Sequence, residues 1–181
     1  MNSSNSLRLV ACGGTFDKHY DEIAGELGFR DSHLPAIVKR ARLTMPVIVE
    51  TLPLKDSLDM QDGDRARVLA ACRAAPEASL VIVHGTDTMR ETAHVLGPYF
   101  GSEQSKVAVE KTSDDAAAKT IVITGAMIPY AIENSDALFN LGFACACAQT
   151  LPPGVYIAMN GRVFWWDDVR KNREAGVFER T

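Results

Sequence analysis

The amino-acid sequence predicts an α/β fold: a single-domain, doubly wound sheet, mainly parallel, with flavodoxin-like or Rossmann-like layering. Apolar runs such as 80–83 and 119–124 are short and rich in β-branched residues, which is typical of strands buried on both faces. These runs alternate with segments of helical periodicity, as in βαβ units with right-handed crossovers. A length of 181 residues with 46% hydrophobic content suits one domain with a sizeable core.

The first half of the chain contains two strands and two helices. An apolar strand at 7–12 leads into a long polar loop that runs through Asp31. A helix near 34–42 and a strand at 46–52 follow. A second helix is expected over 62–75, opened by an Asp-Gly-Asp sequence and ended by Pro76.

The second half repeats the alternation around one irregular stretch. After the strand at 80–83, a helix is expected over 89–98, with Thr88 and Glu91 as a capping box. Residues 101–119 are charged and rich in Ser and Ala, which indicates an insertion in a surface connection, and 106–110 alternates like an edge strand. The remaining elements are a strand at 119–124, a helix at 136–150 and a strand at 154–160.

Composition excludes several function classes. The net charge of −4 without a long basic run argues against nucleic acid as a partner. No apolar run is long enough for a membrane span, and the first six residues are polar, so a cytoplasmic location is expected. The four cysteines form no Cys-x-x-Cys pair, which favours free thiols.

Neither a metal nor an organic cofactor is expected. The four histidines are scattered, and the acidic cluster at 56–64 lacks the spacing of a calcium loop, so it is interpreted as a loop and a helix start. The first turn lacks the Gly-x-Gly-x-x-Gly spacing of dinucleotide-binding folds, and no phosphate-binding loop motif is present.

Two apolar strands end in small, hydroxyl-bearing turns. One turn is Gly13-Gly14-Thr15, and the other is His84-Gly85-Thr86-Asp87-Thr88. Ligands of parallel sheets bind at the carboxyl ends of the strands, so both turns are expected to border one site. Local explanations stay open, because Thr15 could be a turn residue, Thr88 a helix cap and Asp87 a first-turn carboxylate.

These turns resemble the two signature segments of the bacterial-type L-asparaginases. Further blocks keep the order of that family, and the resemblance covers Leu7 to Phe178. The additional blocks are Asp56-Ser57-Leu58-Asp59-Met60, Gly125-Ala126-Met127, Phe139-Asn140-Leu141, and Met159-Asn160 through Asp168-Val169-Arg170-Lys171.

The resemblance implies an amidohydrolase that converts L-asparagine to L-aspartate and ammonia through a threonyl acyl-enzyme, with weaker glutaminase activity. Thr15 resembles the nucleophile, and Tyr20 resembles a tyrosine that closes over it on a flexible loop. A second group, formed by Thr86, Asp87 and Lys171, is implied to move protons during deacylation. The implied substrate-binding residues are Gly14, Ser57, Leu58, Asp59, Gly85, Thr86, Asp87 and Ala126.

Three departures from the family pattern matter. The sequence resembles only the N-terminal domain of long-chain members, so residues 1–181 are expected to form an asparaginase N-terminal-type domain without the second, C-terminal domain. Leu58 stands where many members carry a polar residue, which removes one hydrogen bond to the ligand. Tyr20 follows Thr15 by only five residues, a closer spacing than in many long-chain members.

The partners implied are a small-molecule substrate and further copies of the chain. A homo-oligomer is expected because asparaginase relatives are oligomeric, and the aromatic run 164–166 is interpreted as an interface patch or as a lid on the core. The main alternative function is an amino-acid-binding module without turnover. An ammonia-supplying subunit of a transamidation assembly and a purely structural subunit are further alternatives.

Overall fold

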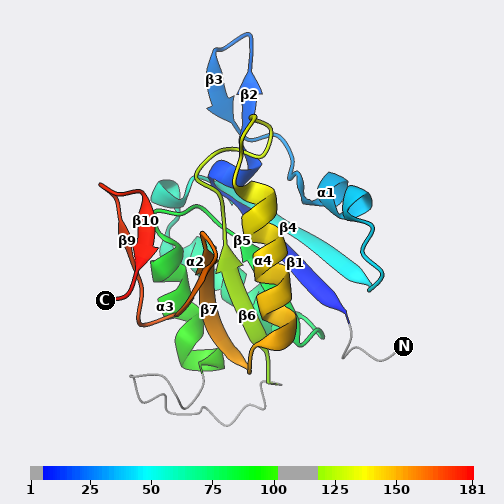
Figure 1. The fold of residues 1–181 in the computed structure, drawn as a ribbon, viewed down its shortest axis with the longest axis vertical. Coiled ribbons are helices and arrows are strands. Elements are labelled where there is room, and N and C mark those ends of the chain that lie inside the picture. Colours follow the sequence, from blue (N-terminus) through cyan, green and yellow to red (C-terminus); the bar gives the residue numbers. More distant parts are fainter. Residues whose placement is uncertain (1–5, 102–117) are drawn as a thin grey trace.

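A central sheet of six strands organises the computed structural model, which describes residues 6–101 and 118–181 (Figure 1). The strand order is β4-β1-β5-β6-β7-β8. All neighbours are parallel except β7 and β8. The strands are β1 (Leu7–Gly13), β4 (Val47–Lys55), β5 (Ser79–Val83), β6 (Thr120–Thr124), β7 (Gly154–Met159) and β8 (Arg162–Trp165). This confirms the expected mainly parallel α/β sheet.

The order of the parallel strands decides between the two layerings that the sequence left open. In chain order, the five parallel strands β1, β4, β5, β6 and β7 occupy the spatial order 2-1-3-4-5. That order is the flavodoxin-like one. Its topological switch point lies between β1 and β5, where open sheets of this kind bind ligands.

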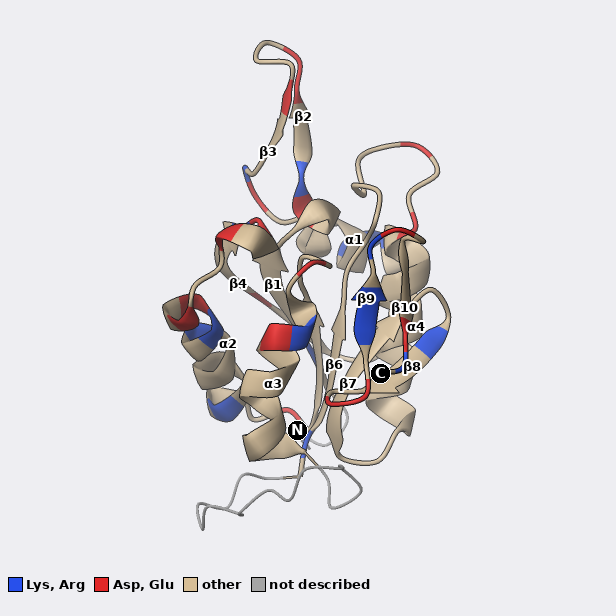
Figure 2. Cartoon of the chain, turned by 90° about the vertical axis from the view of Figure 1, so that its left-hand side faces the viewer, with Lys and Arg blue, Asp and Glu red and all other residues tan. Residues whose placement is uncertain are grey.

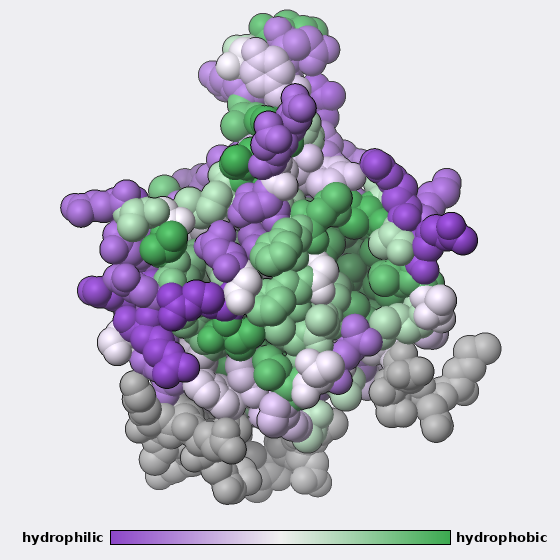
Figure 3. Space-filling model, in the orientation of Figure 1, coloured by the Kyte–Doolittle hydropathy of each residue, from purple (hydrophilic) through white to green (hydrophobic). Residues whose placement is uncertain are grey.

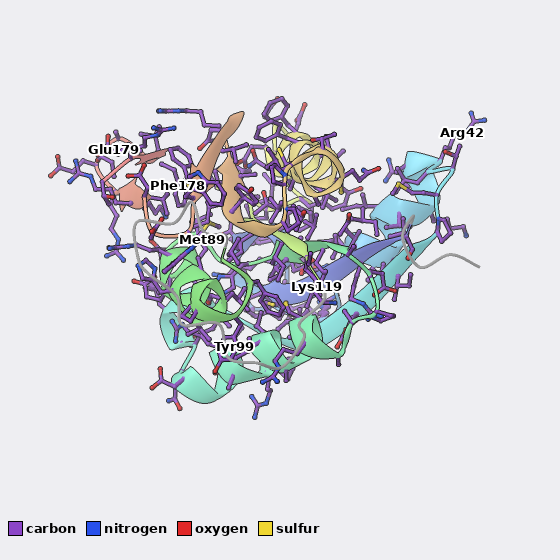
Figure 4. The ribbon with its side chains drawn as sticks, turned by 90° about the horizontal axis from the view of Figure 1, so that it is seen from below. Arg42, Met89, Tyr99, Lys119, Phe178 and Glu179 are labelled. Carbon is purple, nitrogen blue, oxygen red and sulfur yellow. The ribbon has the colours of Figure 1, made fainter. Side chains whose placement is uncertain are left out.

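Helices cover both faces of the sheet. The helices α1 (Leu34–Ala41) and α4 (Ala137–Thr150) pack on one face, and α2 (Asp62–Ala74) and α3 (Met89–Phe100) pack on the other, as the view from below shows (Figure 4). Each face of the sheet packs against one hydrophobic cluster, and alternate residues of a strand point into different clusters. Leu80 and Ile82 of β5 face α2 and α3, whereas Val81 and Val83 face α1 and α4. Continuous apolar strands are the result.

The polar loop expected before residue 31 contains a β-hairpin. Strands β2 (His19–Asp21) and β3 (Glu26–Gly28) pair antiparallel and project from the body of the molecule (Figure 1). Asp21 Oδ1 accepts hydrogen bonds from the backbone N–H groups of Ile23 and Ala24, which closes the turn. The hairpin packs neither face on the core, so its sequence carries no apolar alternation, and pattern analysis missed it.

The C-terminal part forms three strands that the sequence analysis did not predict. The strand β8 extends the central sheet, while β9 (Arg170–Asn172) and β10 (Val177–Glu179) form a separate antiparallel pair. Phe178 of β10 is buried in the same core cluster as Met89 of α3, which anchors this pair on the body (Figure 4).

The aromatic run 164–166 is a lid on the core. Phe164 and Trp166 are only 2% and 3% exposed, so the interpretation as an interface patch is wrong for them. The Trp166 ring lies against α3 at Gly97, where an added Cβ would lie 2.4 Å from Trp166 Cδ2. Only a glycine leaves room for the indole at this point. The helix α3 also continues through Pro98, two residues beyond its expected end.

Two further predictions concern the insertion at 101–119 and the possibility of a membrane span. The interpreted insertion lies largely outside the described residues, and its expected edge strand at 106–110 lies wholly outside them. Within the described parts of the chain, no helix is long and apolar enough to cross a membrane. Apolar side chains gather over α4, where Leu138 and Phe139 are exposed (Figure 3).

Candidate active site

The two hydroxyl-bearing turns touch each other through their glycines. Ala11 of β1 and Val83 of β5 are register partners at the carboxyl ends of the two strands, so both turns begin at the same level. Gly14 has a φ of +74°, and a Cβ on it would lie 2.3 Å from both Cα and N of Gly85. Two backbones can approach this closely only where neither residue has a side chain. The turn that carries Thr15 therefore lies directly on the turn that carries Thr86.

Ser57 lies against the same glycine contact. It begins the short 3-10 helix η3 (Ser57–Asp59), is buried, and would contact a Cβ on Gly85 at 2.5 Å. Asp56 shapes this turn, because its Oδ1 accepts a hydrogen bond from Leu58 N. Leu58 and Asp59 are exposed on the turn. The predicted binding residues Gly14, Ser57 and Gly85 are thus brought together.

Thr88 holds the Ser57 turn instead of capping α3. Its Oγ1 donates a 2.7 Å hydrogen bond to the Ser57 carbonyl, and no side-chain cap forms at the start of α3. The predicted capping box at Thr88 is therefore wrong. A local cap competes with any acceptor that tertiary packing supplies, and here an acceptor 31 residues away engages the hydroxyl. In the acidic cluster, Asp64 Oδ2 accepts from Gln61 N at the start of α2, as expected of a helix start.

Lys171 reaches the second turn from the far end of the chain. Its Nζ donates to Thr86 Oγ1 at 2.8 Å and lies 3.0 Å from Asp87 Oδ1. The lysine side chain is only 12% exposed, and Arg173 Nε lies 3.6 Å from the same Asp87 oxygen. Lys171 lies on the strand β9, which runs beside β10 in Figure 2, and Arg173 follows the end of that strand. Thr86, Asp87 and Lys171 therefore form one hydrogen-bonded group.

His84 orients the peptide group between Gly85 and Thr86 in the second turn. The histidine is fully buried, and its Nδ1–H donates to the Gly85 carbonyl at 2.8 Å, since a carbonyl can only accept. Its Nε2 then accepts from Thr92 Oγ1 at 2.8 Å. Burial lowers the pKa of His84 to about 4, so the imidazole is neutral near pH 7. The sequence analysis missed this role, although a histidine between a buried strand and a glycine was a usable signal.

The loop that contains Ala126 borders the same turn. A Cβ on Gly125 would lie 2.3 Å from the His84 carbonyl oxygen. Asn140, buried on α4, donates to the Gly125 carbonyl and accepts from Asn160 N. Asp136 accepts hydrogen bonds from the N–H groups of Met127 and Ile128. The resemblance had included Asn140 in a matching block, but its role in holding this loop emerges only from the structure.

Thr15 and Tyr20 are positioned differently from each other. Thr15 begins the 3-10 helix η2 (Thr15–Asp17) at the glycine contact and is partly exposed. Tyr20 lies on the projecting hairpin and is 57% exposed. In the part of the chain that the structure describes, neither hydroxyl takes part in a hydrogen bond. The structure thus brings Thr15 into the group at the glycine contact but leaves the Tyr20 side chain turned to solvent.

The chemistry available at this edge is that of hydroxyl, amine and carboxylate groups. Among the described residues, no group of three His, Cys, Asp or Glu side chains could hold a metal ion. Thr15 and Thr86 supply hydroxyl groups, Lys171 an amine and Asp87 a carboxylate, which are the kinds of group that nucleophilic and acid–base chemistry use.

Comparisons with known proteins show which family the chain resembles. Residues 6–177 match the family model described as "Asparaginase, N-terminal". The chain belongs to the asparaginase family. The matched residues include Gly14, Ser57 and Gly85, which meet at the carboxyl edge of the sheet.

Individual relatives agree with this assignment. A Haemophilus influenzae protein named "Probable L-asparaginase periplasmic" is 27% identical over 191 residues, covering 95% of this chain and 48% of that protein. A Pseudomonas fluorescens "Glutaminase-asparaginase" is 35% identical over 135 residues, covering 73% and 32%. The solved structure titled "Probable Cytoplasmic L-asparaginase" from Campylobacter jejuni is 25% identical with a TM-score of 0.74, covering 94% and 50%.

The matched region covers most of this chain but only part of each relative. This asparaginase-family chain spans about half the length, or less, of the curated relatives it matches. The similarity runs over nearly the whole of this chain, from the first strand to β10.

Proposed function

We propose that this protein is an amidohydrolase that converts L-asparagine to L-aspartate and ammonia and acts more weakly on L-glutamine. The observation that carries the proposal is the group formed by Lys171, Thr86 and Asp87, which lies beside the Gly14–Gly85 contact that brings Thr15 close. Membership of the asparaginase family and the names of the relatives support the same reaction class.

The proposed reaction has two steps. The Thr15 hydroxyl attacks the side-chain amide carbon and gives its proton to the Tyr20 oxygen as the hairpin closes, while Tyr20 passes its own hydroxyl proton to the leaving nitrogen, which departs as ammonia. The resulting Thr15 ester is then attacked by water. Lys171, held by Thr86 and Asp87, passes the protons of this second step and restores the Thr15 hydroxyl, releasing L-aspartate.

Substrate binding is assigned to the surrounding turns. Ser57 and the backbone amides of its turn would hold the α-carboxylate of the substrate, and Asp87 would pair with the α-ammonium group. The side chain of Leu58 is exposed and offers no hydrogen bond to the substrate. Asp59 supplies a carboxylate on the same turn. Backbone N–H groups around Gly85, Thr86 and Ala126 are assigned to the developing oxyanion, where each donor is worth about 3 kcal/mol.

An ammonia-release assay on L-asparagine, L-glutamine and D-asparagine tests the reaction. We expect the highest kcat/KM with L-asparagine and a lower one with L-glutamine, since one methylene changes transition-state binding by about 1–3 kcal/mol. Addition of hydroxylamine should divert the ester to aspartyl hydroxamate. Stabilisation of the wild-type protein by L-asparagine without ammonia release would instead identify an amino-acid-binding module without turnover.

We further propose that the protein acts as a homo-oligomer in the cytoplasm. The exposed Leu138 and Phe139 lie on α4, a helix without a charged residue, and supply an apolar face that a second subunit can cover. All four cysteines are free, which suits a reducing compartment. Sedimentation analysis of the wild-type protein and of Phe139→Ser tests the assembly, and a monomeric wild-type protein would contradict it.

A further inference from the structure

The base of the projecting hairpin is closed by a single carboxylate. Asp17 ends η2, two residues after Thr15, and the chain then runs out through β2 and β3 and returns at Ser32. Asp17 Oδ1 accepts a 3.0 Å hydrogen bond from Ser32 Oγ and a 2.9 Å bond from His33 N. One oxygen atom therefore ties the departing end of the hairpin segment to its returning end.

The other oxygen of this carboxylate is unusual. Asp17 is completely buried, and its Oδ2 has no hydrogen-bond partner within the described residues. Burial raises the pKa of Asp17, although the hydrogen bonds from His33 N and Ser32 Oγ act in the opposite direction. An unpaired buried oxygen costs stability and calls for an explanation beyond packing. Asp17 lies between the turn that carries Thr15 and the hairpin, so a role in holding these two segments together supplies that explanation.

Asp17 and its neighbour Lys18 are also connected to the turn that carries Thr15 and to the Ser57 turn. Asp17 N donates to the Gly14 carbonyl at 3.2 Å, and Lys18 N donates to the Thr15 carbonyl at 3.3 Å. Lys18 Nζ forms a 2.6 Å ion pair with Asp56, the residue that shapes the turn of Ser57. A displacement of the hairpin base is thus transmitted to both turns.

We propose that Asp17 is a positioning residue, which couples the hairpin that carries Tyr20 to the turn that carries Thr15. The carboxylate makes the hairpin base and the nucleophile turn one rigid unit, so that Tyr20 closes onto Thr15 in a defined geometry. This inference rests on the proposed function for the identity of the reacting residues. The contacts of Asp17 themselves do not depend on it.

The variant Asp17→Ala, which removes the tie, tests the coupling. A misplacement of reacting groups by about 1 Å lowers rates up to about 100-fold, so we expect kcat to fall by at least about tenfold. KM should change less than about threefold, because the Ser57 turn remains held by Thr88. Amide hydrogen exchange over 19–28 should accelerate, while exchange in β1 and β5 stays slow.

Two further variants separate positioning from loss of a buried acid. Asp17→Asn keeps an acceptor oxygen at Oδ1 and should recover most of kcat and of the hairpin protection. Glu77→Gln removes another buried acid, at the other end of the sheet, where it pairs with Arg8, and should lower stability without changing kcat or hairpin exchange. If Asp17→Ala does not fold, Ser32→Ala takes its place, because it removes one of the two donors. Amide exchange should then accelerate in the hairpin but not in β1 or β5.

The outcomes distinguish this inference from the proposed function. A wild-type protein that hydrolyses no amide would refute the proposed function, whereas the exchange data would still decide whether Asp17 holds the hairpin. Wild-type hairpin exchange in both Asp17→Ala and Ser32→Ala would overturn the coupling. A lower kcat in Asp17→Ala without faster hairpin exchange would also overturn it.

Discussion

Lys171 Nζ donates a 2.8 Å hydrogen bond to Thr86 Oγ1, although the two residues lie 85 positions apart in the sequence. The lysine side chain is only 12% exposed and Asp87 Oδ1 lies 3.0 Å from the same nitrogen, so Nζ bridges the hydroxyl and the carboxylate. Nothing in the local sequence distinguishes Lys171 from its basic neighbours, yet Lys171 is the residue that donates to the Thr86 hydroxyl.

Lys171→Met should lower kcat far more than it weakens substrate binding. General acid–base groups contribute about 100- to 10,000-fold to rates, and the loss should fall within that range. Steady-state ammonia release measures kcat and KM together. Arg173→Met is the matched control, because Arg173 is mostly exposed and lies 3.6 Å from the same carboxylate; its kcat should stay within about threefold of wild type. Equal losses in the two variants would contradict a specific role for Lys171.

Thr15→Ala should abolish turnover while leaving stability nearly unchanged. The Thr15 hydroxyl makes no hydrogen bond with any described residue, so its removal should shift the free energy of unfolding by less than about 0.5 kcal/mol. The matched control is Thr124→Val, because Thr124 is buried and donates a 2.8 Å hydrogen bond to the Ala158 carbonyl. That variant should lose about 1 kcal/mol and remain active. Urea unfolding and ammonia release report both properties, and an active Thr15→Ala would reject Thr15 as the nucleophile.

Gly14→Ala should destabilise the protein and separate the two turns. The new Cβ would lie 2.3 Å from the Gly85 backbone, and the φ of +74° adds strain for any other residue. We expect a loss of at least about 2 kcal/mol together with a large loss of activity. The control is Gly142→Ala on α4, where a Cβ meets no atom within 4 Å and should stabilise the helix by about 0.5–1 kcal/mol. If both variants have the stability of wild type, the glycine contact is unimportant.

Acidification should destabilise the fold through His84. The pKa of this buried histidine is about 4 in the folded protein, against 6.5 for an exposed imidazole, so the unfolded chain binds the additional proton between these values. Stability therefore falls as pH drops from 6.5 towards 4, and about 3 kcal/mol is lost in total. Urea midpoints at pH 7.5, 5.5 and 4.5 measure the slope.

His84→Asn isolates this histidine from the other groups that titrate in acid. The asparagine amide can still donate to the Gly85 carbonyl but does not titrate, so the slope between pH 6.5 and 4.5 should flatten. Asp56, whose pKa is lowered mainly by the hydrogen bond from Lys18, stabilises the fold above pH 3.8, and that contribution is lost only at still lower pH. An unchanged slope in His84→Asn would show that other groups cause the acid sensitivity.

Much of the fold was predictable because its signals are local. Continuous β-branched runs identified β5 and β6, and helical periodicity separated by turn residues identified the four helices. The hairpin and the strands β9 and β10 were missed, since three-residue strands outside the central sheet have too few residues for an alternation pattern. The expected cap at Thr88 failed for a related reason, because a distant carbonyl supplied a better acceptor.

The sequence alone determined the alternating α/β architecture, the hydroxyl-bearing turns and the resemblance to the asparaginase family. These are properties of short segments, which a linear pattern records in full. The tertiary structure decided the strand order, the burial of Trp166, the turn held by Thr88 and the reach of Lys171 to Thr86. Each of these depends on which distant segments pack together. That choice follows from the burial of apolar faces over the whole chain, which no local pattern encodes.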